Sequence, residues 1–311
     1  MSPEAFKIPL ATAEVTTVPC CVLFLRGALL ESRHSVLPIW TELARGDATR
    51  RLRHRSGAAM PWYVPVDAEA DASVLFDKSD ARAGCRRLEL AIGEGADQAT
   101  LEVLDLLPVL GNERASYVRI RFPKRTSPIR IVRVAEAALQ SLPLYWGTAG
   151  MGFELVSGSR HLAYRRVAAL AKRHWGVQIL DLSTLQWDAL HGMPSVNWLT
   201  LVGNDFARSN GTSVEAIGTA AKTLVQHRVY CRRAAHGLIL AAGNTPSSGD
   251  INLGDDIDAS IRVARLLEPL LLRDHLGLPG PFADPKVMSA WLQRFQNPAA
   301  WLACDISDWN D

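Results

Sequence analysis

Two short stretches in the first half of the chain alternate between apolar and polar residues. In the stretch 85–94, CRRLELAIGE, Leu88, Leu90 and Ile92 alternate with charged or small residues. The stretch 116–123, SYVRIRFP, repeats this pattern. Because successive side chains of a strand point to opposite faces, the alternation predicts a sheet with one buried and one solvated face, which is typical of antiparallel pairing.

The rest of the chain divides into apolar strands and amphipathic helices. Further strands are predicted at 18–27 and 144–158, and a hairpin at 229–244. Helices are predicted at 35–46, 126–143, 159–176, 211–228, 258–277 and 284–295. Because the strands come in groups flanked by helices, we predict an α+β fold: an antiparallel sheet with helices packed on one side. A division of this fold into two similar halves remains an alternative at this point.

Turn and cap residues mark several of these boundaries. Pro128 fits the first position of a helix, and Thr212 with Glu215 forms a capping box for the fourth predicted helix. Asp258 is predicted to cap the fifth helix. Pro269 should break that helix, because proline has no N–H for the helical ladder.

The balance of charges argues against nucleic acid or an anionic membrane as a partner. The chain has 311 residues, and its 34 basic and 32 acidic residues leave a net charge of +2. A DNA-binding domain normally carries a basic face or stripe. The local cluster from Arg50 to Arg55 could bind phosphate, but no aromatic residues interleave with it. A solvated helix end is the better interpretation of this cluster.

Cysteine usage and the N-terminal sequence favour the cytoplasm. The five cysteines are odd in number, and they form neither a CxxC motif nor a zinc spacing, so we interpret them as reduced thiols. The first apolar run, VPCCVLFL, is too short for a signal peptide or a membrane span. We therefore expect a cytoplasmic protein.

The polar loop 247–258 has the densest group of side chains that could bind a ligand. It contains Asp250, Asn252, Asp255 and Asp256, and oxygen ligands in such a loop could hold a hard cation. Counted as an EF-hand from Asp250, however, the loop has the wrong residue at most ligand positions. We interpret it as an exposed turn or as a carboxylate-rich protein contact, and we predict no metal site.

The histidines lack the spacing of a catalytic or metal-binding group. His191, His227 and His236 have no second ligand one helical turn away, and no nucleophile elbow or phosphate-binding loop occurs. His236 with Gly237 is better explained as a turn in which the glycine supplies a positive φ. The residues therefore predict no catalytic site and no cofactor, and they favour a binding protein over an enzyme.

Some of the nine tryptophans are candidates for a partner-binding surface. Trp40 and Trp175 lie at helical core spacing, whereas Trp62, Trp146 and Trp309 lie in or near predicted loops. Exposed tryptophans are enriched where protein interfaces are energetically strongest. Trp62 and Trp146 are therefore candidate contact residues, although a core position remains the simpler explanation for each tryptophan taken singly.

The stretch 193–206, MPSVNWLTLVGNDF, is predicted to be a buried strand that turns at Gly203 into a short helix. Asn204 would cap this helix. In a strand, Trp198 would share a face with Val202 and point away from Asn197. Asn197 has no catalytic partner within the sequence pattern.

The block from this stretch to residue 252 resembles a bacterial family, the type VI secretion immunity proteins that pair with VRR-type nuclease effectors. The family has an NWLT-like segment ending in glycine, an apolar strand running into a G-x-x-P turn, and a GD-[VI]-N loop. The matching residues are Asn197, Trp198, Leu199, Thr200 and Gly203, then Gly243 and Pro246, then Gly249, Asp250 and Asn252. A basic residue often follows the last motif in this family, whereas this chain has Leu253.

The resemblance implies an antitoxin that binds a nuclease toxin and occludes it without catalysis, cofactor or membrane. Nuclease surfaces that contact phosphates are usually basic, so acidic loops are natural contacts. Expected contacts are Asp250, Asn252, Asp255, Asp256, Trp62 and Trp146, together with the acidic segment Asp67–Asp80 and the acidic tail. We expect Asn197, Trp198, Gly203 and Gly249 to be structural.

The same resemblance suggests how the chain is divided. A single immunity-type domain would span residues 15–275, with 15–156 and 157–275 as its possible halves. Residues 276–311 would add a C-terminal helix and the acidic tail.

Two alternative functions stay open on the sequence alone. One is a small-molecule-binding protein or hydrolase-like enzyme, in which the loop 244–258 and the glycine-rich segment 147–152 share one cleft. The other is a nucleic-acid-binding module that uses the arginines from Arg50 to Arg55.

Overall fold

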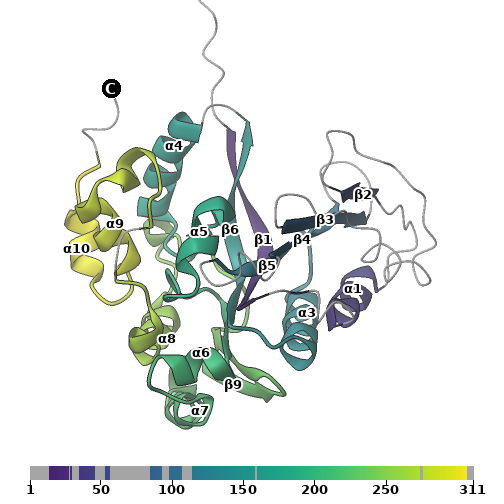
Figure 1. Cartoon of the computed structure of the whole chain (residues 1–311). Coiled ribbons are helices and arrows are strands. Elements are labelled where there is room, and N and C mark those ends of the chain that lie inside the picture. The colour runs from purple at the N-terminus through teal and green to yellow at the C-terminus, as the bar shows by residue number, and fades with distance from the viewer. Residues whose placement is uncertain are drawn as a thin grey trace, which may run out of the picture.

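Ten strands form one sheet through the middle of the molecule (Figure 1). The computed structural model describes residues 14–27, 29, 35–45, 53–56, 85–92, 98–106, 114–157, 160–273 and 276–306. The strands are β1 (Glu14–Leu25), β2 (Arg53–Ser56), β3 (Cys85–Ile92), β4 (Ala99–Leu106), β5 (Ser116–Arg121), β6 (Trp146–Ser157), β7 (Val177–Ile179), β8 (Leu199–Gly203), β9 (Val229–Ala234) and β10 (Gly237–Ala242). Their order is β2-β3-β4-β5-β1-β6-β8-β10-β9, and β7 pairs with β6 outside this path.

Helices cover both faces of this sheet. They are α1 (Leu37–Ala44), α3 (Pro128–Ser141), α4 (Arg160–Arg173), α5 (Leu182–Asp188), α6 (Asn204–Ser209), α7 (Val214–Lys222), α8 (Asp258–Leu266), α9 (Pro285–Leu292) and α10 (Pro298–Ala303). Short 3₁₀ turns occur at Val225–His227, Ile251–Leu253, Glu268–Leu270 and Gly280–Ala283. In Figure 1, α1 and α3 lie on one side of the sheet, and α4, α9 and α10 lie on the other. The α+β class with antiparallel pairing is confirmed, although the helices flank two faces and not one.

The central strand β1 explains why both faces need a cover. From Val18 to Leu25 every residue is buried. Leu23 joins the core beneath α1 and α3, while Val22 and Phe24 join the core beneath α4. From Val18 onward β1 is apolar at every position, and because it lies between β5 and β6 it must bury both of its sides. The prediction of an inner strand at 18–27 is thus confirmed.

Strand β6 exchanges one neighbour for another halfway along its length. Its first part pairs antiparallel with β8, from Trp146 to Ala149, and its next part pairs parallel with β7, from Met151 to Phe153. All other strand pairs of the described sheet are antiparallel. Gly150 sits at the exchange. The neighbouring strands therefore diverge at this glycine.

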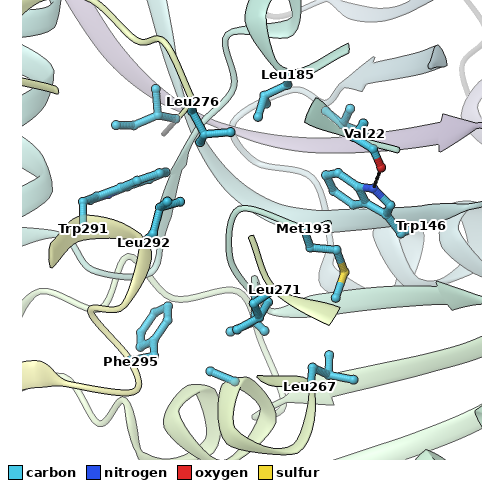
Figure 2. Close-up of a cluster of buried hydrophobic side chains, with 14 of the residues drawn as sticks. Val22, Trp146, Leu185, Met193, Leu267, Leu271, Leu276, Trp291, Leu292 and Phe295 are labelled. Atoms are coloured by element: carbon cyan, nitrogen blue, oxygen red, sulfur yellow. Dashed lines mark hydrogen bonds between the residues drawn. The ribbon is translucent and has the colours of Figure 1, made fainter. Parts of the chain in front are cut away.

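The C-terminal segment packs in the same core as the strands and α4. Trp291, Leu292 and Phe295 lie in one apolar cluster with Leu276 and Met193 (Figure 2). The segments before and after residue 275 share one core. The boundary predicted at residue 275 remains a prediction from the sequence. The halves 15–156 and 157–275 also remain a prediction, and a single sheet runs through both.

Several first turns differ in detail from the sequence prediction. Ser213, and not Thr212, caps α7, since its Oγ accepts the N–H of Ala216 at 3.1 Å. Asn204 and Asp258 are the first helical residues of α6 and α8, and neither caps its helix through its side chain. Each shift is one residue, which is the usual uncertainty of a helix boundary.

The hairpin between β9 and β10 turns at His236 as predicted, but for another reason. Gly237 does not have a positive φ. A Cβ atom at Gly237 would lie 2.1 Å from the carbonyl oxygen of Val202 on β8. The glycine therefore permits a close approach of two backbones.

Candidate functional site

The three separated motif segments meet beside one hollow of about 290 Å³. The hollow lies between residues 196–198, the end of β10 with the turn that follows it, and residues 255–260. Gly249 lines the same hollow from the last motif. The order of the motifs along the chain thus reflects one local assembly in space.

Asn197 occupies the point where β6 changes its neighbour. Its Nδ2 donates to the carbonyl of Met151 at 3.1 Å, and its Oδ1 accepts the N–H of Trp198 at 2.8 Å. A Cβ atom at Gly150 would lie 2.0 Å from that Oδ1. The amide therefore satisfies backbone groups that the diverging strands leave open, and it needs a glycine opposite it.

Trp198 ties β8 to the end of β10. Its indole N–H donates to the carbonyl of Gly243 at 3.1 Å, and its own carbonyl accepts the N–H of Ala242 at 2.7 Å. The side chain is 5% exposed and belongs to the core beneath α3, together with Leu199. The predicted shared face with Val202 is wrong, because β8 begins only at Leu199 and the strand alternation does not extend back to Trp198.

Two motif glycines allow close backbone contacts. A Cβ atom at Gly203 would lie 1.8 Å from the carbonyl oxygen of Leu144. Gly249 has φ +60°, and its carbonyl accepts the N–H of Trp175 at 3.1 Å. Asn197, Trp198, Gly203 and Gly249 thus all have contacts that explain a structural role.

Asp250 is a buried anchor of the polar loop. The Nε–H of Arg173 is shared between both carboxylate oxygens of Asp250, at 2.8 and 2.9 Å, and the N–H of Asn252 donates to Oδ1 at 3.1 Å. The guanidinium of Arg173 holds the pKa of Asp250 below its ordinary value. Asp250 is 4% exposed, so its charge is directed inward at α4.

The other loop residues divide into inward and outward groups. Asp255 accepts the Ser247 hydroxyl at 3.0 Å and the N–H of Asp250 at 2.9 Å, which closes the loop. Asp256 is exposed and forms an ion pair with Arg228, and Asn252 is exposed as well. Within the described residues, no group of three or more His, Cys, Asp or Glu could hold a metal ion.

The remaining predicted residues lie apart from the hollow. Trp146 is 2% exposed, and its indole N–H donates to the carbonyl of Ala189 at 2.6 Å, so it is a core residue (Figure 2). Trp62 and the segment Asp67–Asp80 lie outside the described residues, as do 307–311 of the tail. The side chains of the Arg50–Arg55 cluster also lie outside them.

The cleft predicted for a hydrolase-like enzyme is not assembled as expected. The segment 147–152 does not line the hollow, although it reaches Asn197 through Gly150. No histidine or cysteine lines this hollow in the part of the chain that the structure describes. His227 instead contacts the carboxylate of Asp258 at 3.2 Å.

A charged depression of about 450 Å³ lies where β4, β5 and β6 face α4 and α5, and the sequence prediction did not include it. On its floor, Arg119 lies 3.9 Å from Glu102 and 3.5 Å from Glu154. At its rim, burial alone would raise the pKa of Asp181, but hydrogen bonds from Ser183 and from the neighbouring Tyr164 and Arg160 lower it. The charged residues that alternate along 116–121 were the available signal.

A second unpredicted groove, of about 470 Å³, lies between α3 and β9. Four arginines and two glutamates line it: Arg45, Arg133, Arg232, Arg233, Glu42 and Glu136. Arg133 is exposed, and it forms no ion pair with any described residue. This surface is therefore the basic counterpart of the acidic loop.

No helix in the described residues is long and apolar enough to cross a membrane. The molecule thus presents its hollows and charged surfaces on a sheet with helices on both faces.

Comparisons with known proteins agree with this arrangement. No curated protein matches the chain. Among solved structures, the Pseudomonas aeruginosa T6SS protein PA0821 is similar with a TM-score of 0.69, over 94% of this chain and 90% of that chain. Its sequence identity of 15% shows a shared fold and no more. The family model of TsiV, type VI immunity for VRR-NUC, matches residues 114–295, which is more than half of the chain. The chain therefore belongs to the family of type VI immunity proteins for VRR-NUC.

Proposed function

We propose that this chain binds a VRR-NUC nuclease effector in the cytoplasm of the producing cell and blocks it by occlusion, without catalysis. The observation that carries the proposal is the family match over residues 114–295. The match covers β5 to α9 and includes all three motif segments.

The arrangement of the motif residues supports binding over catalysis. The side-chain N–H groups of Asn197 and Trp198 donate hydrogen bonds to backbone carbonyls, and no histidine or cysteine lines the described hollow beside them. Inhibition by occlusion needs only a preformed surface with a few anchor residues.

Among the predicted contacts, the residues that reach the surface remain proposed contacts. Asn252 and Asp256 are exposed and Asp255 is half-buried, so their polar groups can meet a basic nuclease surface. Asp250 and Trp146 are buried, and we assign them the support of that surface. Trp62 stays a proposed contact from the sequence.

The test is inhibition of a purified VRR-NUC effector from the same bacterium. Purified chain should abolish cleavage of plasmid DNA at about one chain per nuclease, and co-expression should rescue growth. Unchanged cleavage at a large excess of chain would refute the proposal.

A matched pair of variants locates the contact. Asp256→Lys should weaken inhibition, whereas Asp205→Lys should not; Asp205 is a matched control because it is also exposed, on α6, and is also paired with an arginine. Equal inhibition by both variants would remove Asp256 from the interface.

A further inference from the structure

Strand β9 is an open edge of the sheet. It pairs with β10 on one side, and no strand in the described part of the chain pairs with its other side. Alternate residues of an antiparallel edge strand turn their N–H and C=O groups outward. Such an edge can accept an additional strand from another chain.

The side chains along β9 are unusually open for a strand of this sheet. Tyr230 is 40% exposed, and the side chains of Arg232 and Arg233 are 71% and 48% exposed. Charges on an edge discourage indiscriminate pairing, so a partner must bring complementary charges. Tyrosine and arginine are the residue types enriched where protein interfaces are strongest.

The two ends of β9 border charged groups of different composition, and Arg232 and Arg233 on the strand itself are ion-paired with Glu136 and Glu215. At its start, Arg228 is held in a left-handed conformation (φ 59°) and is paired with Asp256, next to Asp255. Toward its end, β9 borders the groove of four arginines and two glutamates against α3. Of those arginines, Arg133 has no ion-pair partner among the described residues. A segment lying along β9 therefore meets the Arg228–Asp256 pair beside Asp255 first, and the groove in which arginines outnumber glutamates later.

From this arrangement we infer that the nuclease effector docks along β9 by adding an extended segment of its own as a further strand. That segment carries acidic side chains where it passes the groove at Arg133 and Arg232. It carries basic side chains where it passes Asp256. The inference rests on the proposed function and specifies which surface performs it.

A protein segment fits this groove better than nucleic acid does. Glu42 and Glu136 lie among the arginines, and both would repel phosphates. An extended peptide can place single carboxylates against single arginines and can also use the outward backbone groups of β9.

The first test measures affinity for a purified VRR-NUC effector from the same bacterium, at low and at high salt. The double variant Arg133→Glu/Arg232→Glu should weaken binding by about tenfold or more at low salt, and by less at high salt. Arg133→Glu alone should weaken it as well, and this variant breaks no ion pair of the described structure. Lys286→Glu, an exposed charge on α9, is the control and should bind as the unaltered chain does.

The second test measures hydrogen exchange of the backbone amides of β9. Hydrogen exchange in the complex should slow in peptides covering 229–234, whereas peptides from α4 should exchange as in the free chain. A complex that forms normally with the double variant, with no slowing at β9, overturns the docking inference and leaves the proposed function intact. Failure of the unaltered chain to bind the effector overturns both.

A third outcome concerns nucleic acid. The unaltered chain could bind a short DNA duplex, and the double variant could lose this binding while it still binds the effector. In that case the groove is a nucleic-acid site and the docking inference is wrong.

Discussion

The loop 247–258 and the groove between α3 and β9 are both dense in charge, but they use their charges in opposite ways. In the loop, Asp250 points inward at Arg173, and Asp255 accepts groups of the loop itself. In the groove, Arg133 and Arg232 stay at the surface. A high density of charge in the sequence therefore does not by itself identify a binding surface.

The difference follows from where each charge finds its partner. Arg173 lies 77 positions before Asp250 and reaches it only because α4 packs beside the loop. A buried carboxylate is tolerated only when it is paired and hydrogen-bonded in this way. Arg232 and Arg233 on the edge strand stay in water, so their ion pairs with Glu136 and Glu215 are not needed to offset burial.

The largest loss of stability should come from a substitution in the motif region, if the residues of that region have a structural role. Trp198→Ala removes a 5% exposed indole and its bond to Gly243, so it should lower the free energy of unfolding by about 3–5 kcal/mol. Chemical denaturation measures this loss. Affinity of the folded fraction for the effector should remain. Lost binding with unchanged stability would instead place Trp198 in the interface.

A smaller loss is expected from Gly150→Ala. The new Cβ would lie 2.0 Å from Oδ1 of Asn197, and relieving such an overlap costs about 1–3 kcal/mol. Gly218→Ala in α7 is the control, because its Cβ would meet only a side-chain atom at 3.8 Å. That variant should be neutral or gain about 0.5–1 kcal/mol. Equal thermal unfolding of both variants would contradict the role of Asn197.

The pH dependence should distinguish the loop from the groove. Because Arg173 lowers the pKa of Asp250 in the folded chain, the ionised carboxylate stabilises the fold above its unfolded pKa, near ~3.9. This contribution is lost as the pH falls through the lower folded pKa. Asp250→Asn should therefore lower the melting temperature at pH 7, and the gap to the unaltered chain should narrow below about pH 4. Asp205→Asn, on an exposed helix, should show no such gap.

The smallest effect on stability should come from the loop's exposed carboxylate. Asp256→Asn breaks the ion pair with Arg228, and both side chains of this pair are about half exposed. The free energy of unfolding should therefore fall by about 0–1 kcal/mol. Binding to the effector should weaken more at low salt than at high salt. A large loss of stability would mean that Asp256 supports the loop, as Asp250 does.

Parts of the fold were predictable because their signals are local. The uninterrupted apolar run at 18–25 predicts an inner strand, and the stripe of Tyr164, Val167 and Ala171 predicts the buried face of α4. The strand β4 and the helices α5 and α10 were not predicted. The helices α5 and α10 are short, and β4 carries Glu102 and Asp105, whose charges suggest exposed positions although both residues are buried.

The contacts that build the site were beyond a sequence pattern. Asn197 bonds a carbonyl 46 positions away, and Gly150 is required only because that amide lies against it. The family resemblance placed the motif residues in order. Their common meeting point beside one hollow, and the position of Asn197 where β6 exchanges β8 for β7, needed the strand register.

The pairing of β1 with β6 determines when a newly made chain can complete the sheet around β1. Phe24 on β1 and Trp146 on β6 are paired, although they are about 120 positions apart. At ~5–20 residues per second, the ribosome needs roughly 6–25 s to make the chain between them. Throughout that time β1 is an apolar strand without its main neighbour. β1 can therefore join its complete sheet only after this interval.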